Sequence, residues 1–182
     1  MNALLSLSRG IDRINAFIGR AVMWLILAAV LVSAGNATMR KVFDISSNAW
    51  LELQWYLFGA AFLLAAAYTL QRNEHIRIDI VSNHLPKALR HAIELFGHAC
   101  MLLPFCALML WETWPSMMES FRIGETSANF GGLLIWPGKS FIVIGFALLF
   151  IQGISELIKR IAIIAGTITD IHEVQHTPLP VE

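Results

Sequence analysis

The chain divides into long apolar stretches that are separated by short polar connections. Four of the stretches are long enough to cross a bilayer, which takes about 20 residues of helix. A soluble bundle of this size would not need four such segments, so each is expected to form one membrane-spanning helix. The predicted spans are residues 14–35, 49–70, 92–114 and 133–158.

Prolines and glycines mark the ends of these stretches. Pro86 can open the third helix at its first turn, and Pro115 is predicted to end it. The sequence Asn129-Phe130-Gly131-Gly132 predicts a loop before the fourth span. Because no Gly/Ser linker or internal repeat divides the chain, residues 1–166 are predicted to form one four-helix membrane domain, and residues 167–182 a cytoplasmic tail.

The N-terminal segment has its own periodicity. Apolar residues recur at helical spacing, while charged residues occupy other positions of the helical wheel: Leu4, Leu7, Ile11, Ile14 and Ile18 against Arg9, Asp12 and Arg13. This pattern predicts an amphipathic helix at the cytoplasmic interface, continuous with the first span or bent from it. A cleaved signal peptide is the alternative, since Val32-Ser33-Ala34 resembles a cleavage site. The charged region before it would be unusually long, and cleavage would leave three spans.

Composition supports the membrane class. Of 182 residues, 57% are hydrophobic and 14% are charged, whereas soluble domains carry about 25% charged residues. Basic and acidic residues both number 13, so no net charge favours nucleic acid as a partner. Cys100 and Cys106 lie six residues apart in one span and point about 240° apart on a helix. They are interpreted as buried thiols rather than an internal disulfide.

The placement of Lys and Arg predicts the orientation. Nine lie in the segments that face the cytoplasm if the N-terminus is inside, against four in the outer segments. The inner set is Arg9, Arg13, Arg20, Arg72, Arg77, Lys87, Arg90, Lys159 and Arg160, and the outer set is Arg40, Lys41, Arg122 and Lys139. Five tryptophans near the predicted outer ends agree with this orientation. We therefore predict an all-α integral membrane protein with four transmembrane helices and both termini in the cytoplasm.

A polar stripe crosses the third span. His91, Glu94 and His98 lie at positions i, i+3 and i+7, on one face of a helix. Metal or haem ligation is one interpretation. However, the other histidines lie in connections or in the tail, so no second span offers an axial partner. Packing against another helix or subunit is favoured, and a haem-binding four-helix redox subunit remains the alternative function.

Glu52 at the start of the second span also has two interpretations. It could be an ion or proton site. It could equally be an interfacial group beside Trp50 and Trp55, or a partner for Arg40, Lys41 or Lys139. The structural role is favoured, and small residues such as Ala61 and Ala65 in the same span predict close helix contacts.

Chemistry-bearing motifs are absent from the sequence. It has no phosphate-binding glycine loop, no HExxH, no CxxC and no nucleophile motif. No span is obviously interrupted at its middle, which is the sequence sign of a transporter's substrate site. An enzyme or a complete transporter is therefore disfavoured.

The link QRNEHIRIDIV, residues 71–81, is charged and alternates like a strand. A lone strand at a membrane surface would leave its edges unpaired. We interpret the link as an interfacial segment whose isoleucines face the bilayer or a helix, while Arg77 and Asp79 face the cytoplasm.

Taken together, the second span and this link resemble the small membrane subunit of tripartite ATP-independent periplasmic (TRAP) transporters. The resembling features are Glu52 at the head of the span and the run His75 to Asp79 at its exit. Glu125-Thr126-Ser127 and Trp136-Pro137 also fall where that family has them. The likeness covers roughly residues 12–160. Many members have glycine where this chain has Ala65, a small-for-small difference.

The resemblance implies a non-catalytic subunit of the bacterial inner membrane. It would scaffold a large, sodium-coupled membrane subunit and help to dock a periplasmic binding protein for uptake of an organic acid. No catalytic, metal or cofactor residue is implied. The candidate interface or structural residues are Glu52, Trp55, Arg72, His75, Arg77, Asp79, Arg122 and Glu125. The solute itself is not identified, because its specificity would reside in another protein.

Overall fold

The computed structural model describes residues 2–45, 47–72 and 86–166. They form long helices, and the only β-type contact among them is an isolated antiparallel bridge between Thr126 and Leu134. The helices are α1 (Asn2–Phe43), α2 (Asn48–Gln71), α4 (Lys87–Phe96), the π-helical turn η1 (Gly97–Leu102), α5 (Leu103–Ile123) and α6 (Trp136–Ile164). Four helical stretches are long and apolar enough to cross a membrane, which confirms the predicted fold class.

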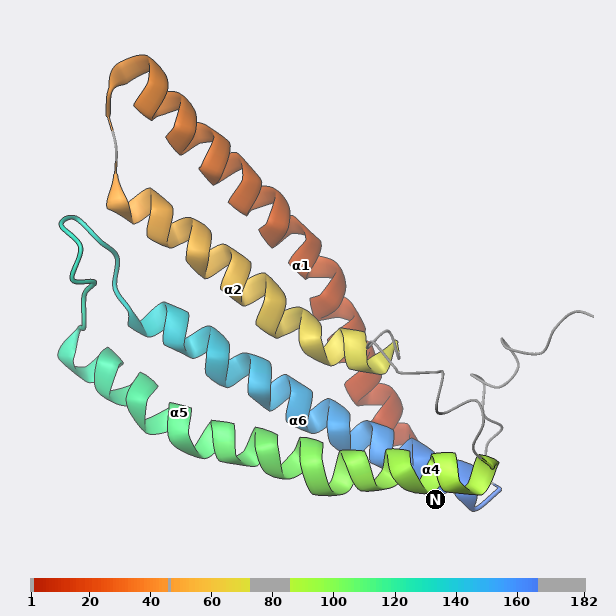
Figure 1. Ribbon diagram of the computed structural model, residues 1–182. Coiled ribbons are helices and arrows are strands. Elements are labelled where there is room, and N and C mark those ends of the chain that lie inside the picture. The colour runs from red at the N-terminus through yellow and green to blue at the C-terminus, as the bar shows by residue number, and fades with distance from the viewer. Residues whose placement is uncertain (1, 46, 73–85, 167–182) are drawn as a thin grey trace, which may run out of the picture.

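The helices form an open layer rather than a closed bundle. Figure 1 shows them side by side in the order α1, α2, α6, α5, and the helix contacts follow the same order. α6 contacts all the other long helices. α2 and α5 lie on either side of it, and α1 also contacts it. α5 packs against α6 alone among the long helices of the described chain. One broad face of α5 and one of α1 are therefore without a helix neighbour in this subunit.

α1 is longer than the predicted span. It runs without a break through 42 residues, about 63 Å at 1.5 Å per residue, whereas a bilayer core is about 30 Å thick. The amphipathic segment is thus continuous with the first span. Ser8 and Asn15 are buried against protein, while the apolar residues Leu4, Leu7 and Ile14 are exposed, as a face turned to the bilayer interface would be.

The buried positions of α1 follow a seven-residue repeat. Ser8, Asn15, Val22 and Ala29 are all buried, and this spacing is that of a helix that packs along one continuous seam. The seam is polar near the N-terminus and apolar beyond it. In the N-terminal segment it is therefore the polar side that packs against protein.

The third span is also longer than predicted. α4, η1 and α5 follow one another from Lys87 to Ile123, and Pro115 lies inside α5. The prediction that Pro115 ends the helix is wrong: proline removes one backbone donor, and the helix continues to Gly124, whose left-handed φ of 62° ends it. The start after Pro86 is confirmed. The π-helical turn directly precedes Pro104, where a wider turn relieves the clash of its ring with the preceding carbonyls.

Glycines on α6 allow close helix contacts. A methyl group at Gly145 would lie 2.8 Å from Leu63 Cβ of α2, and one at Gly138 would lie 3.1 Å from the Tyr56 ring. On the opposing helix, Ala60 and Ala67 are buried. The small residues noted in the sequence therefore hold α2 and α6 together, as small-residue contacts do in membranes.

Candidate functional site

Buried polar side chains gather at the two ends of the layer. Among the described residues these are Ser8, Asn15, Gln152, Ser155 and Arg160 near the chain N-terminus, and Glu52 and Ser120 near the α5–α6 loop. The other buried side chains of the described residues are apolar. Polar function in this subunit is therefore concentrated at its ends.

Glu52 is the centre of the first cluster, which we call the Glu52 cradle: Glu52, Ser127, Asn129 and Leu133. Glu52 is only 4% exposed. Its Oε1 accepts hydrogen bonds from the Ser127 hydroxyl and from Asn129 Nδ2, the latter at 2.8 Å. Its Oε2 accepts one from the Leu133 backbone N–H at 2.6 Å. One carboxylate on α2 therefore holds the α5–α6 loop at three points, with charge-assisted hydrogen bonds.

The loop itself is tightly folded around this carboxylate. Ser127 N–H donates to Leu133 O at 2.9 Å, and Gly132 N–H donates to Asn129 O at 3.0 Å. Gly131 adopts a φ of 71°, which favours glycine. At Gly132 a methyl group would lie 2.6 Å from Ser127 Cβ and 2.8 Å from Glu52 Oε1. The two glycines predicted to form a loop are thus each required by its geometry.

A second ion pair closes the base of the loop. Lys139 Nζ of α6 lies 2.7 Å from Glu125 Oε2. The hydrogen bond from Lys139 holds the pKa of Glu125 below its ordinary value. Glu125 is therefore ionised at neutral pH and ties the end of α5 to the start of α6.

These contacts correct one expectation for Glu52. Within the described residues it forms no ion pair with Arg40, Lys41 or Lys139, and Lys139 is bound to Glu125 instead. The reason is the direction of its side chain. Glu52 shares a face of α2 with Tyr56 and Ala60, which packs on α6, so its carboxylate meets the α5–α6 loop.

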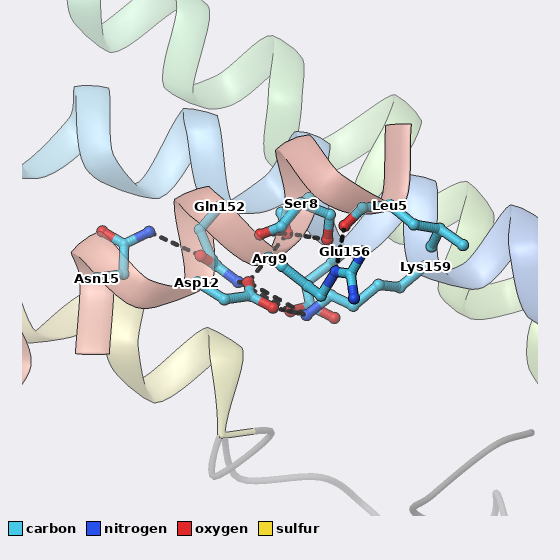
Figure 2. A network of polar contacts seen from close by, with 9 residues as sticks. Leu5, Ser8, Arg9, Asp12, Asn15, Gln152, Glu156 and Lys159 are labelled. Atoms are coloured by element: carbon cyan, nitrogen blue, oxygen red, sulfur yellow. Dashed lines mark hydrogen bonds and ion pairs between the residues drawn. The ribbon is translucent and has the colours of Figure 1, made fainter. Parts of the chain in front are cut away.

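The second cluster lies between α1 and α6 at the opposite end of the layer, and Figure 2 shows it from close by. We call it the α1–α6 network; it consists of Ser8, Asp12 and Asn15 of α1 and Gln152, Ser155, Glu156 and Lys159 of α6. Gln152, which is 0% exposed, is its hub. Its Nε2 donates to Asp12 Oδ1 at 2.8 Å and to Glu156 Oε1 at 2.9 Å, and its Oε1 accepts from Asn15 Nδ2 at 2.6 Å.

Ionic and hydroxyl contacts complete the network. Lys159 Nζ lies 3.2 Å from Asp12 Oδ2 and also pairs with Glu156. Ser155 Oγ donates to Asp12 Oδ1 at 3.0 Å and lies 2.7 Å from Ser8 Oγ. Every charged member thus has a partner of opposite charge or a hydrogen bond, which is what burial of charge requires. The sequence interpretation found Asp12 but assigned it to the water-facing side.

The polar stripe of the third span meets α6. Glu94 Oε2 lies 2.9 Å from Arg160 Nη1, and both side chains are largely buried. His98 Nδ1 lies 2.7 Å from the Glu94 carbonyl oxygen of its own helix. The interpretation that the stripe packs against another helix is therefore confirmed for Glu94. Within the described residues, no group of three or more His, Cys, Asp or Glu side chains could hold a metal ion.

The remaining predicted site residues are dispersed. Arg72 ends α2, and its guanidinium carbon lies 5.7 Å from the centre of the Tyr68 ring. Trp55 is exposed on α2. Arg122 is 81% exposed and only 3.8 Å from Glu119, an exposed pair of little energetic weight. His75, Arg77 and Asp79 lie outside the described residues. The structure therefore joins Glu52 with residues of the Glu125 loop but does not bring the whole predicted set together.

An apolar groove lies between α5 and α6. It measures about 570 Å³, within the size range of small-molecule pockets. Its walls carry no charged side chain and consist of Ala107, Leu110, Trp111, Trp114, Pro115 and Phe150. A groove of this kind offers no charged side chain to pair with the carboxylate of an organic acid.

Comparison with known proteins agrees with this architecture. The pattern of the family described as "Tripartite ATP-independent periplasmic transporters, DctQ component" matches residues 29–162. The C4-dicarboxylate TRAP transporter small permease protein DctQ of Vibrio cholerae serotype O1 (strain ATCC 39315 / El Tor Inaba N16961) is 31% identical over 87 residues. That alignment covers 48% of this chain and 37% of the relative, so the chain spans little more than a third of the relative's length. No solved structure matches.

The matched region includes the end of α1, all of α2, α4, η1 and α5, and nearly all of α6. It contains the whole Glu52 cradle, Gln152 and the Glu94–Arg160 pair. The resemblance seen in the sequence is confirmed, and the family is one of transporter components rather than enzymes. The chain therefore belongs to the DctQ family and is a small permease subunit of a TRAP transporter, a multi-pass protein of the inner membrane.

Proposed function

We propose that this chain is the non-catalytic scaffold subunit of a sodium-coupled TRAP transporter for an organic acid. It would pack against the large membrane subunit and help to dock the periplasmic binding protein, and it would hold no cofactor of its own. The observation that supports this best is the open layer. Two of its helices, α1 and α5, present long apolar faces without a helix neighbour in this subunit.

The distribution of polar groups supports the same role. In the described residues, buried polar side chains gather in two groups, one near the α5–α6 loop and one where α1 meets α6. The cluster members are bonded to one another, as in the Glu52 cradle and the α1–α6 network. Within the two clusters, Asn15 Oδ1 is the buried side-chain atom left without a partner, and an amide oxygen is an acceptor, which cannot donate to the carboxylate of an organic acid. Transport chemistry is therefore assigned to the large subunit.

We further propose that both termini face the cytoplasm. The start of α1, the end of α2, the start of α4 and the end of α6 lie at one end of the layer in Figure 1, and most Lys and Arg residues are in these regions. The Glu52 cradle then faces the periplasm. Reporter fusions at the α5–α6 loop and at the C-terminus would test this, since the opposite pattern of periplasmic activity would overturn it.

Reconstitution tests the scaffold role. Together, this chain and the large subunit should accumulate an organic acid in liposomes when a sodium gradient and the binding protein are supplied. The large subunit should lose this activity without the chain. Accumulation by the chain alone would contradict the proposal, as would failure of the two subunits to purify together.

The haem hypothesis is less well supported. Family membership favours the transporter, and the Glu94 side chain of the stripe is bound to Arg160. A visible absorption spectrum of the purified chain provides the direct comparison. A Soret band that disappears in His98→Ala would favour the haem hypothesis over the scaffold.

A further inference from the structure

The tip of the α5–α6 loop carries one large apolar side chain. Phe130 is 97% exposed. The stretch 124–132 is otherwise built of small and polar residues, and Phe130 is its only large apolar one. An exposed phenylalanine loses the stabilisation that burial would give it. Among the large apolar side chains of the described residues Phe130 is the most exposed, and it lies in a polar loop rather than on a membrane-spanning helix.

The backbone on both sides of Phe130 is firmly held. The Phe130 carbonyl oxygen accepts a hydrogen bond from Asn48 Nδ2 of α2 at 3.0 Å. The preceding residue, Asn129, donates to Glu52 Oε1 at 2.8 Å, and its carbonyl accepts from Gly132 N–H. Gly132 in turn packs so closely against Glu52 that a methyl group would not fit. The loop thus presents the ring in a fixed place, which reduces the entropy lost when a partner binds it.

The surroundings of the ring favour protein over lipid. Phe130 follows polar and small residues of the loop, of which Thr126 and Asn129 are also exposed, and we call these two its polar rim. Interface anchors have this form, with an aromatic side chain at the centre and polar groups around it. The α1–α2 connection at the same end of the layer is different. There the exposed residues Val42, Phe43 and Ile45 follow Arg40 and Lys41, a mixture typical of a bilayer interface.

We propose that Phe130 is the aromatic anchor by which this subunit binds a soluble partner, and that Glu52 is the positioning residue that holds it. This inference rests on the proposed function, so the partner is the periplasmic binding protein. The ring enters an apolar pocket on that protein, and the polar rim of the loop excludes water around it. Glu52 touches neither the solute nor the partner, and acts through the loop.

The first test measures affinity. The complex of this chain with the large subunit is placed in nanodiscs and titrated with the binding protein. Phe130→Ala is expected to raise the Kd by about tenfold or more. Phe43→Ala serves as the matched control, because Phe43 is an exposed phenylalanine at the same end of the layer but at the α1–α2 connection, and its Kd should stay at the wild-type value. Uptake by Phe130→Ala should recover at high binding-protein concentration, since only docking is weakened.

The second test separates positioning from contact. Glu52→Gln is expected to raise the Kd, because an amide cannot accept all the hydrogen bonds of the cradle. The double variant Glu52→Gln/Phe130→Ala should bind no more weakly than Phe130→Ala alone, since both changes remove one contact. Fully additive effects would show that Glu52 does not act through Phe130.

The third test identifies what touches the ring. A photoreactive benzoylphenylalanine in place of Phe130 should crosslink to the binding protein in the assembled complex. Crosslinking only to phospholipid or to the large subunit would overturn the inference, as would an unchanged Kd for Phe130→Ala. In those cases the two membrane subunits still purify together. Failure of the proposed function is distinguishable, because the subunits would then not purify together at all.

Discussion

The Glu52 cradle and the α1–α6 network use buried carboxylates in opposite ways. In the cradle, one carboxylate accepts hydrogen bonds from a loop whose backbone it shapes. In the network, side chains of two helices bind one another, and Gln152 links three of them. The first arrangement fixes a local conformation. The second fixes how two helices lie against each other. Damage to the network should therefore destabilise the whole subunit, whereas damage to the cradle should loosen one loop.

The largest effect on stability is expected at the network end, at the buried ion pair. Arg160→Ala leaves Glu94 without the guanidinium that lies 2.9 Å from it. Removing one member of a buried pair costs about 3 kcal/mol of unfolding free energy. Denaturant titration in detergent measures this cost. The double variant Glu94→Leu/Arg160→Leu should recover much of the loss, and a strictly additive loss would show that the pair does not interact.

The second-largest loss of stability is expected for Gln152→Leu. It removes the acceptor of Asn15 and a donor to both Asp12 and Glu156, which should cost about 2 kcal/mol. Gln54→Leu on α2 is the control for the same change of side chain, and Gln54 makes no hydrogen bond in the cradle or the network. If both variants melt at the wild-type temperature, the network does not hold α1 to α6.

Glu52→Gln should behave differently from both. The melting temperature should change little, because the helices keep their contacts. The amide hydrogen of Leu133 should exchange about tenfold faster or more, since it loses its carboxylate acceptor. Hydrogen exchange with mass spectrometry measures both the loop and the helices. Equal acceleration in α1 and in the loop would break the distinction between the two ends.

The smallest effect concerns pH at the base of the loop. The pKa of Glu125 is lowered by its hydrogen bond from Lys139. A carboxylate with a lowered folded-state pKa contributes stability that is present above its ordinary pKa of about 4.3 and is lost as pH falls through the lowered value. Loop protection should thus be constant from pH 8 to about pH 5 and weaken only at lower pH. In Lys139→Met most of this contribution should be missing already at neutral pH, so loop protection should be lower there and should fall less on acidification, and a profile like that of the wild type would contradict this.

Sequence patterns predicted the fold better than the clusters. Apolar length alone was enough to locate four spans, and Pro86 and the Gly131-Gly132 pair marked real boundaries. The prediction that Pro115 ends the third helix was wrong, because a proline removes one backbone hydrogen bond and a long apolar helix tolerates that loss. The partners of Glu52 lie 75 to 81 positions further along the chain. A local sequence pattern does not relate residues that are so far apart in the chain, so the cradle could be recognised only from the structure.

The contacts of Asp12 were missed for the same reason, because its partners on α6 are distant in the sequence. Its spacing relative to Leu4 and Leu7 is that of an interfacial helix, and only the arrival of α6 makes its side the buried one. A more direct sign was available in the seven-residue spacing of Ser8, Asn15, Val22 and Ala29. That repeat mixes polar and small apolar residues, and a search for apolar positions alone passes over it.

The central place of α6 also has a consequence for biosynthesis. α1 emerges from the ribosome first and α6 last, yet Asp12 and Asn15 find their partners only on α6. During most of translation these polar groups must remain at the membrane surface or be held by another protein. A chain truncated before Gln152 would keep three spans and lose every partner of the network on α6. Such a fragment should be a ready substrate for membrane quality control, so the last helix determines whether the first is retained.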